Sequence, residues 1–370
     1  MTVSLRQLNR TYLRRQSLLD PDPRPVDEVV AHLVALQAQE VDAPYVGLWA
    51  RIPGFRHEHL TDALNDRRVV RGGLLRGTQH ITTGADYAWL RPLVKERMGR
   101  VGLSPFAKQT AGLDLAELAG AAREVLAGQV LTRPALAKRL GERYPGRDAM
   151  ALAWAAQHQL SLLHPPPSGT WRRRGHVSCV LAEEWLGRPL SDKPTVRELM
   201  WRYLAACGPA TVADLQIWSG LRKLRDEVEE LRPELTVHRD ERGRELFDRP
   251  DLALADPDEP APVRFLPEFD NLVLSHEDRT RIVSDEDRAL VCPGYSMVHP
   301  TFLVDGFVAG IWAVEPGGDA AGVRVTPFRP LSDETTGEVL AEAARLLEFL
   351  QLGDGAGVRL ERPVKNLHRV

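Results

Sequence analysis

The chain has 370 residues with a formal net charge of −3, and its 43% hydrophobic and 27% charged residues are typical of a globular protein. This length exceeds one ordinary hydrophobic core and predicts about two to four domains. No apolar run approaches the roughly 20 residues of a membrane span, and residues 1–15 contain no apolar signal segment, so a cytoplasmic protein without membrane attachment is expected. The cysteines, Cys179, Cys207 and Cys292, lie far apart, which argues against a disulfide framework and a zinc knuckle.

Charge is distributed unevenly along the sequence. Residues 1–100 hold 15 Arg and Lys against 11 Asp and Glu, residues 101–200 hold 13 against 9, and residues 201–370 hold 20 against 31. A basic N-terminal half beside an acidic C-terminal half indicates a directed electrostatic surface. Most of the positive charge is arginine, which suits bidentate phosphate contacts, although a GC-rich coding sequence would give the same bias. The net negative charge therefore does not exclude a nucleic-acid partner.

The first segment, residues 1–105, predicts three helices followed by a pair of strands. Its first helix opens with a capping-box pattern, and the later elements follow from hydrophobic periodicity. The expected elements are helices over 4–19, 26–37 and 57–65, and two strands within 69–83.

Within this segment, residues 36–39 (Leu-Gln-Ala-Gln) are the most informative. Apolar residues between 26 and 33 recur at helical spacing, and their stripe continues to Gln37, where an apolar residue belongs. Pro44 limits the length of this helix, so Gln39 should lie in or just past its last turn. Two amides that tie down a helix C-terminus are one explanation. The other explanation is that both amides face one cavity. A buried amide without hydrogen-bond partners costs about 1–3 kcal/mol, so each amide needs partners of one kind or the other.

Two further segments repeat the order of helices followed by strands. In residues 106–192 we expect helices over 114–127, 133–143 and 148–162, with Thr132 as an N-cap, a proline-rich loop at 165–169, and a strand after residues 171–174. In residues 193–255 we expect capped helices over 195–206 and 211–218, a helix over 221–231 and a hairpin over 236–247.

Helix–turn–helix followed by a β-hairpin is the winged-helix arrangement. The sequence therefore predicts an α+β fold with three tandem winged-helix modules, at residues 1–105, 106–192 and 193–255. Such modules bind nucleic acid or each other. Three in tandem, two of them net basic, favour a long curved DNA-binding surface.

The C-terminal part differs in composition. An acidic, proline-rich linker at 256–262 precedes a strand-rich segment, residues 263–370. Its clearest hairpin is expected at 301–308, turned by Asp-Gly, and a last amphipathic helix at 334–352. We expect this segment to form a small, barrel-like domain.

Standard catalytic motifs are missing from the sequence. It contains no P-loop, no Gly-x-Gly-x-x-Gly after a strand and no Gly-x-Ser-x-Gly elbow. His57 and His59 would point apart on a helix, so no metal site is expected there. Composition and spacing alone therefore predict a DNA-binding surface but do not indicate a chemical reaction.

Four motifs in order carry a resemblance to a known family. They are Leu-Gln-Ala-Gln at 36–39, Leu-Arg-Gly-Thr-Gln-His-Ile at 75–81, Phe-Leu-Pro-Glu-Phe-Asp-Asn-Leu-Val-Leu-Ser-His at 265–276 and Val-His-Pro-Thr at 298–301. With them the chain resembles the tandem winged-helix DNA glycosylases, in their Gln-Φ-Gln form, over essentially its whole length. Each motif alone is modest, but the four together are specific.

The resemblance implies hydrolysis of the N-glycosidic bond of N7-alkylguanine by a monofunctional enzyme, with Gln37 and Gln39 as catalytic residues. It also implies the unhooking of interstrand crosslinks such as those of azinomycin, in DNA repair and self-resistance to an alkylating natural product. No metal or organic cofactor is implied, and the partner of the expected monomer is double-stranded DNA carrying alkylated or crosslinked guanine. A winged-helix regulator or scaffold without enzymatic activity, and a nuclease or lyase, stay open as alternatives.

Two groups of residues are expected to contact DNA. Arg76, His80 and the run Arg172, Arg173 and Arg174 lie on or beside predicted wings in the basic half of the chain. The other group is the apolar hairpin tip, which we expect to reach the channel beside the two glutamines as a wedge. The tip residues are Val304, Asp305, Gly306 and Phe307.

Overall fold

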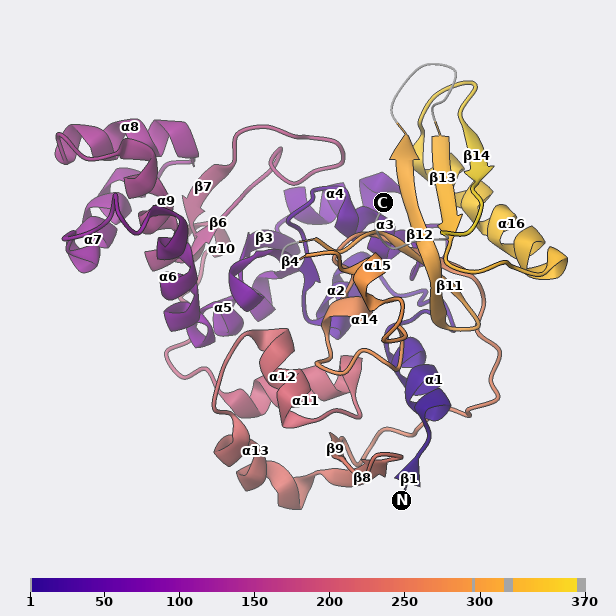
Figure 1. Cartoon of the computed structure of the whole chain (residues 1–370). Helices are drawn as coiled ribbons and strands as arrows, with labels where there is room; N and C mark the ends of the chain where they lie inside the picture. Colours follow the sequence, from indigo (N-terminus) through magenta and orange to yellow (C-terminus); the bar gives the residue numbers. More distant parts are fainter. Residues whose placement is uncertain (1, 295–296, 316–321, 365–370) are drawn as a thin grey trace.

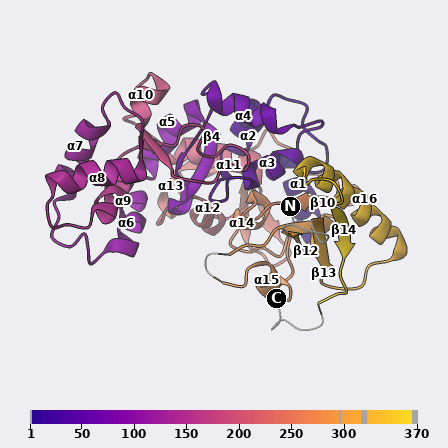
Figure 2. The ribbon, with the colours of Figure 1, turned by 90° about the horizontal axis from the view of Figure 1, so that it is seen from above.

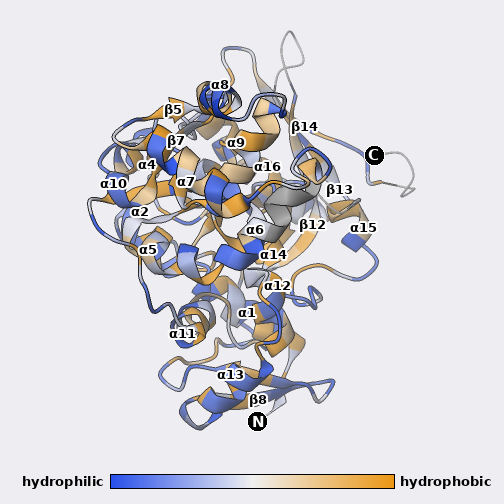
Figure 3. Ribbon diagram, turned by 90° about the vertical axis from the view of Figure 1, so that its left-hand side faces the viewer, coloured by the Kyte–Doolittle hydropathy of each residue, from blue (hydrophilic) through white to orange (hydrophobic). Residues whose placement is uncertain are grey.

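The computed structural model describes residues 2–294, 297–315 and 322–364 and shows a mixed α+β architecture (Figure 1). The helices of residues 26–65 lie in the middle of the molecule in Figure 1. The helices of residues 115–159 form one end and the sheet of residues 264–360 forms the opposite end in both views (Figures 1 and 2). Individual helices carry both hydrophilic and hydrophobic residues, as expected where one helix face is packed (Figure 3).

The N-terminal unit has the predicted helix at 57–65 and the two predicted strands, but it departs from the prediction elsewhere. The first helix ends at Arg15 rather than Leu19, and the helices Ala43–Trp49 and Gly84–Leu93 were not predicted. Ser4 caps the first helix by accepting a hydrogen bond from the Gln7 backbone N–H at 3.1 Å. The second helix ends at Leu33 rather than Gln37, and Val34 then turns the chain with a φ of 67°. The elements are β1 (Thr2–Val3), α1 (Leu5–Arg15), α2 (Val26–Leu33), β2 (Leu36–Gln37), α3 (Ala43–Trp49), α4 (His57–Asn65), β3 (Val69–Gly73), η1 (Leu75–Gly77), β4 (Gln79–Thr83) and α5 (Gly84–Leu93).

The second unit builds a core of its own. Thr132 caps its middle helix, as predicted, by accepting from the Ala135 backbone N–H at 3.4 Å. Its elements are α6 (Lys95–Leu103), η2 (Ser104–Phe106), α7 (Leu115–Leu126), β5 (Leu131–Thr132), α8 (Arg133–Arg143), α9 (Ala149–Gln159), β6 (Leu162–Leu163), β7 (Ser178–Leu181) and α10 (Ala182–Leu186). Its strands join those of the first unit in one sheet, with the order β2-β4-β3-β6-β7-β5. Gly72 pairs with Leu163 at the junction.

The third unit also contains capped helices followed by a hairpin. Thr195 and Thr211 cap its first two helices, as predicted, and its third helix begins at Arg225, later than expected. Its elements are α11 (Val196–Cys207), α12 (Val212–Ser219), α13 (Arg225–Leu231), η3 (Arg232–Glu234), β8 (Thr236–Asp240) and β9 (Glu245–Asp248). β1 lies parallel to β8, so the N-terminal strand completes a three-stranded sheet here.

The C-terminal unit is an open sheet, and the predicted barrel is wrong. Its five strands have the order β10-β11-β12-β13-β14, which leaves β10 and β14 at opposite edges instead of pairing to close a barrel. The last helix packs Val339, Ala343 and Leu346 against apolar strand residues such as Phe265 and Val325. The elements are β10 (Arg264–Leu266), α14 (Asn271–Leu274), α15 (Arg288–Val291), β11 (Thr301–Val304), β12 (Phe307–Glu315), β13 (Gly322–Pro327), α16 (Asp333–Leu350) and β14 (Gly357–Leu360).

The hydrophobic cores show how these units are joined. One core collects side chains from the first, third and C-terminal units, including Tyr12, Tyr203, Trp218 and Leu272. A separate core lies within residues 118–181. Among the described residues, every helix is too short or too polar to cross a lipid bilayer.

Candidate active-site cleft

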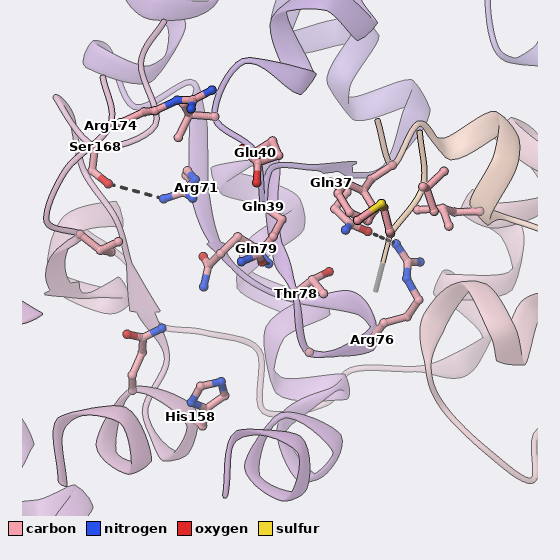
Figure 4. A pocket seen from close by; sticks show the side chains of 18 of the residues that line it. Gln37, Gln39, Glu40, Arg71, Arg76, Thr78, Gln79, His158, Ser168 and Arg174 are labelled. Carbon is pink, nitrogen blue, oxygen red and sulfur yellow. Dashed lines mark hydrogen bonds between the residues drawn. The ribbon is translucent and has the colours of Figure 1, made fainter. Parts of the chain in front are cut away.

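A cleft of about 1110 Å³ opens where the first, second and C-terminal units meet. It contains both predicted catalytic residues, Gln37 and Gln39. Figure 4 shows Gln39 beside Gln79 of the neighbouring strand and Gln37 beside Arg76. Residues more than 250 positions apart in the sequence contribute to its wall, from Gln37 to Val298. The cleft is therefore a product of the tertiary fold and of no single module.

Gln37 reaches this cleft from a strand, so its predicted place on a helix is wrong. Leu36 pairs with Ile81 and Gln37 pairs with His80 in the ladder between β2 and β4. The hydroxyl of Thr82 also donates to the Val34 carbonyl at 2.7 Å, where the helix has ended. These contacts replace the helical hydrogen bonds that the periodic pattern favoured, and Gln37 keeps only 8% of its surface exposed.

Arg76 holds the Gln37 side chain from the β3–β4 turn. Its Nη2 donates to Gln37 Oε1 at 2.9 Å (Figure 4). Its Nη1 donates to the Trp218 carbonyl of α12 at 2.6 Å. A Cβ on Gly220, which has a φ of 78°, would lie 3.0 Å from Arg76 Cα. Gly220 therefore allows α12 and the turn to approach closely. Arg76 thus links β2 to the third unit.

Arg71 holds the backbone between the two glutamines. Its Nη2 and Nε donate to the Ala38 carbonyl at 2.9 and 3.3 Å, and its side chain is 5% exposed. The 165–169 loop covers it, and a Cβ on Gly169 would lie only 2.4 Å from Arg71 Cδ. The backbone N–H of Gln79 makes a weaker contact with Gln39 Oε1, at 3.5 Å. Gln37 is therefore fixed by Arg76, whereas Gln39 is exposed and loosely held.

The charge of the cleft is strongly positive. Seven arginines line it against one carboxylate, Glu40; the arginines are Arg71, Arg76, Arg133, Arg173, Arg174, Arg279 and Arg288. Burial lowers the pKa of Arg71 and of Arg76 to about 10, which still leaves both charged at neutral pH. Such a wall is suited to the phosphates of nucleic acid.

His80 is placed behind the cleft, so its predicted contact with DNA is wrong. Its side chain is fully buried, and Nδ1 lies 3.0 Å from the Thr78 carbonyl. Burial, together with the charge of Arg76, lowers the pKa of His80 to about 3. A neutral imidazole in this position supports the strand opposite Gln37 and cannot reach a phosphate.

The three arginines at 172–174 divide into two roles. The Arg172 guanidinium donates to the Leu350 and Gln351 carbonyls at the C-terminus of α16, which satisfies helix carbonyls that lack internal partners. Arg173 and Arg174 line the cleft, and Arg174 is 77% exposed. Phosphate contact stays a prediction for Arg173 and Arg174. The Arg172 guanidinium is instead engaged by the carbonyls at the end of α16.

The hairpin at 301–308 forms as predicted, but its tip lies elsewhere. Asp305 pairs with Arg6 at 2.6 Å and with buried Arg10, and the Gly306 carbonyl accepts from Asn9 Nδ2 at 2.8 Å. Residues 304–307 therefore dock on α1 and do not line the cleft of the two glutamines. The predicted place of this tip beside the two glutamines is wrong, because its polar groups are engaged by a helix almost 300 residues away in sequence.

Several residues of the cleft were missed in the sequence. Arg133 donates to Gln157 Oε1 at 3.0 Å, and its guanidinium lies 5.0 Å from the Trp154 ring centre. Arg279 donates to Cys292 Sγ at 3.0 Å. The only sequence signal for Arg71 was its place in a strand of otherwise apolar and glycine residues, where a buried charge requires a reason.

Comparisons with known proteins agree with this architecture. A family model described as "DNA glycosylase AlkZ-like" matches residues 30–349, and the chain belongs to this family. The solved structure of the Streptomyces sahachiroi DNA glycosylase AlkZ is similar, with a TM-score of 0.78 and 22% sequence identity over 98% of this chain and 100% of that chain. No curated protein sequence matches.

These matches confirm the resemblance seen in the sequence and show a DNA glycosylase with a mixed α+β fold. They favour the enzyme over the regulator and nuclease alternatives that the sequence left open. At 22% identity, the structural likeness establishes the shared fold.

Proposed function

We propose that this glycosylase releases N7-alkylguanine from double-stranded DNA, with Gln37 and Gln39 as its catalytic residues. The observation that carries the proposal is the position of both glutamines in one cleft with seven arginines and a single carboxylate. The arginines are suited to the phosphates of a duplex. The glutamines are suited to a substrate that needs no strong acid or base.

The chemistry of the lesion explains why amides are sufficient. Alkylation at N7 gives guanine a positive charge, so the base is already a good leaving group and the transition state develops positive charge at C1′. A glutamine accepts through Oε1 and donates through Nε2, but it does not exchange protons at neutral pH. The proposed role of both residues is therefore to position the attacking water, and such positioning contributes several kcal/mol of barrier reduction.

The contacts of the two glutamines divide this task. Arg76 fixes the amide plane of Gln37 through Oε1, so this side chain needs no reorganisation during the reaction. Gln39 is exposed, and a water can replace its weak contact with the Gln79 backbone N–H. Glu40 adds a negative charge next to Gln39, which favours a cationic transition state in a cleft otherwise lined by arginines.

Several residues that line the cleft are exposed to solvent, so the cleft is open enough to admit a crosslinked base. Gln39, Glu40, Arg173 and Arg174 are all exposed there. A base that remains attached to the opposite strand cannot be extruded into a closed pocket. We therefore propose that the enzyme acts as a monomer on interstrand crosslinks within this open cleft.

We further propose that three winged-helix modules track the duplex around this cleft. Residues 1–105, 106–192 and 193–255 would form the modules, with residues 263–370 as the C-terminal domain. The support is the repeated order of helices followed by paired strands in each range.

The test uses a duplex with one defined N7-alkylguanine, scored for alkali-dependent strand breaks under single-turnover conditions. Gln37→Ala and Gln39→Ala should each slow base release by about 10²–10³-fold, the usual loss for one oriented donor or acceptor in an active site. Gln129→Ala is the matched control, because Gln129 is exposed and lies outside the cleft.

Thermal melting of each variant separates catalysis from folding. The expected result is an unchanged melting temperature for Gln39→Ala with a large loss of rate. If the rates of both variants follow the amount of folded protein, the glutamines are structural and the proposal is wrong. A second substrate, with the guanine crosslinked to the opposite strand, tests the unhooking activity separately.

A further inference from the structure

Phe269 has a backbone conformation that a phenylalanine rarely adopts. Its φ is 60°, in the left-handed region where a Cβ crowds the neighbouring carbonyl. A bulky side chain that is held there stores strain, and such residues concentrate at ligand-binding and catalytic sites. Glycine would adopt this φ without strain, so the presence of a large aromatic residue calls for a reason beyond the turn itself.

Buried contacts on the C-terminal side of Phe269 impose this conformation. Asp270 accepts from Arg51 Nη2 and Nη1 at 2.8 and 2.9 Å, and both side chains of this ion pair are almost fully buried. The next residue, Asn271, donates through Nδ2 to the Ala35 carbonyl at 2.8 Å, and its own carbonyl accepts from the Tyr12 hydroxyl. The loop is therefore tied to α1, to the turn after α3 and to the segment before β2.

The same contacts place Phe269 beside the catalytic strand. Ala35, which Asn271 contacts, directly precedes β2, and Phe269 and Gln37 line the same cleft. The Phe269 side chain is half-buried: it packs against the main hydrophobic core and also borders the cleft. A strained backbone thus holds an aromatic ring at the wall that the glutamines share.

The surroundings of Phe269 indicate what this ring contacts. The charged wall of the cleft is almost entirely arginine, which suits phosphates but repels a positively charged base. The face of an aromatic ring attracts a cation, and it stacks on any nucleobase. An aromatic ring is therefore the kind of side chain that can hold a cationic alkylated purine in this cleft.

We propose that Phe269 stacks on the alkylated base and holds it against the catalytic glutamines. This inference rests on the proposed function, since it assumes that the lesion enters the Gln37–Gln39 cleft. Phe269 thereby contacts the substrate, and the strain in its backbone keeps the ring in place before the DNA binds.

The test separates the ring from the backbone with matched variants. Phe269→Gly removes both the ring and the strain, whereas Phe269→Ala removes the ring and retains the strain. Both should slow single-turnover release of N7-alkylguanine by about 10- to 100-fold, the effect of losing one base–aromatic stack. Phe269→Gly should nevertheless melt at a higher temperature than Phe269→Ala, and both should bind undamaged duplex like the wild type.

A second pair covers the case in which the small variants fold poorly. Phe269→Leu keeps apolar bulk without a ring, and Phe269→Tyr keeps the ring. We expect the leucine variant to lose base release and the tyrosine variant to retain it. If the leucine variant releases the base at the wild-type rate, or if undamaged DNA binding falls as much as base release, the stacking role is wrong.

The outcome is distinguishable from a failure of the proposed function. Should Gln37→Ala and Gln39→Ala release the base normally, the cleft is not the catalytic site and the proposed function fails. Should those variants be slow while Phe269→Gly is as fast as the wild type, only the role of Phe269 is overturned.

Discussion

Two pairs of buried arginines differ in their hydrogen-bond acceptors: one pair donates to carboxylates and the other to neutral oxygens. Arg15 of α1 reaches Asp248 of the third unit at 2.6 Å, and Arg51, in the turn after α3, reaches Asp270 of the C-terminal unit at 2.8 Å. In the cleft, Arg71 donates to a backbone carbonyl and Arg76 donates to a carbonyl and an amide oxygen. The first pair of arginines is neutralised by carboxylates, and the second pair is not.

This difference shows how one residue type serves two purposes. A buried ion pair cancels its own field and acts as a crosslink between distant parts of the chain. A buried arginine on neutral oxygens keeps its positive charge, so its field extends into the adjoining cleft. The burial of Arg71 and Arg76 without carboxylates is costly for folding, and the phosphates of DNA are the anions that we propose to balance it. Buried Arg91 also donates only to carbonyls, at His158 and Leu160, but it lies outside the cleft.

The largest expected effect comes from comparing one arginine of each kind. Arg51→Met strands the buried Asp270 carboxylate and should lower the free energy of unfolding by about 3–5 kcal/mol. Arg71→Met strands one carbonyl and should lower it by only about 1–3 kcal/mol. Urea unfolding of both variants measures the contrast, and equal losses would remove the distinction between the two sets.

Activity should show the reverse order for the same two variants. Arg71 fixes the Ala38 carbonyl between the glutamines, so Arg71→Met should slow base release by about 10²-fold, as small misplacements of catalytic groups do. Arg51→Met should lose less rate per folded molecule than Arg71→Met, because Arg51 acts on the cleft only through the loop that holds Phe269. Arg71→Lys, which restores the charge but not the two-pronged contact, should recover only part of the rate.

A second prediction tests which cleft arginines contact phosphates. Arg173→Gln combined with Arg174→Gln should make the log–log salt dependence of duplex binding shallower by about 2 units, with equal effects on damaged and undamaged DNA. Arg172→Gln is the control, because Arg172 is committed to the α16 C-terminus. It should leave the salt slope unchanged. If the salt slope changes only for Arg172→Gln, then Arg172 contacts phosphate and Arg173 and Arg174 do not.

The smallest expected effect concerns His80, which is buried near Arg76, the arginine that donates to neutral oxygens and not to a carboxylate. Its folded-state pKa of about 3 lies below the ordinary value of 6.5, so between these pH values the unfolded chain binds a proton that the folded chain does not. His80 therefore contributes a loss of stability as the pH falls below about 6.5, with a slope of about 1.4 kcal/mol per pH unit.

His80→Gln removes this contribution and should flatten the pH dependence by about 2 kcal/mol between pH 7 and pH 5. Urea unfolding at both pH values measures it. The other buried histidines, such as His164 and His276, keep their contributions in both proteins. An identical pH dependence of the variant and the wild type would show that His80 takes up a proton in the folded protein.

Local signals in the sequence predicted much of the secondary structure. Thr132, Thr195 and Thr211 cap the helices that follow them, because a side-chain hydroxyl before an apolar periodic run satisfies a free backbone N–H whatever the rest of the chain does. The Asp305-Gly306 turn also formed where expected. These features depend on neighbours within a few residues.

The failures depend on partners that are distant in sequence. Gln37 lies on a strand because β4 pairs with it, and periodicity within residues 26–37 carries no information about β4. The hairpin tip docks on α1 through Arg10, which is 295 residues from Asp305. The family resemblance predicted the catalytic role of the two glutamines. Arg71 and Phe269 were not predicted as site residues, because only the tertiary structure places them in the cleft.

The ion pairs of α1 also bear on how the chain folds as it is synthesised. Arg15 meets Asp248 only after another 233 residues have been added, and Arg10 waits longer for Asp305. At roughly 5–20 residues per second, the ribosome delivers Asp248 on the order of 10–50 s after Arg15. The second unit, whose separate core is complete by residue 181, can fold during that interval. The N-terminal helix is thus made first, but its ion pairs with Asp248 and Asp305 form only after most of the chain has been synthesised.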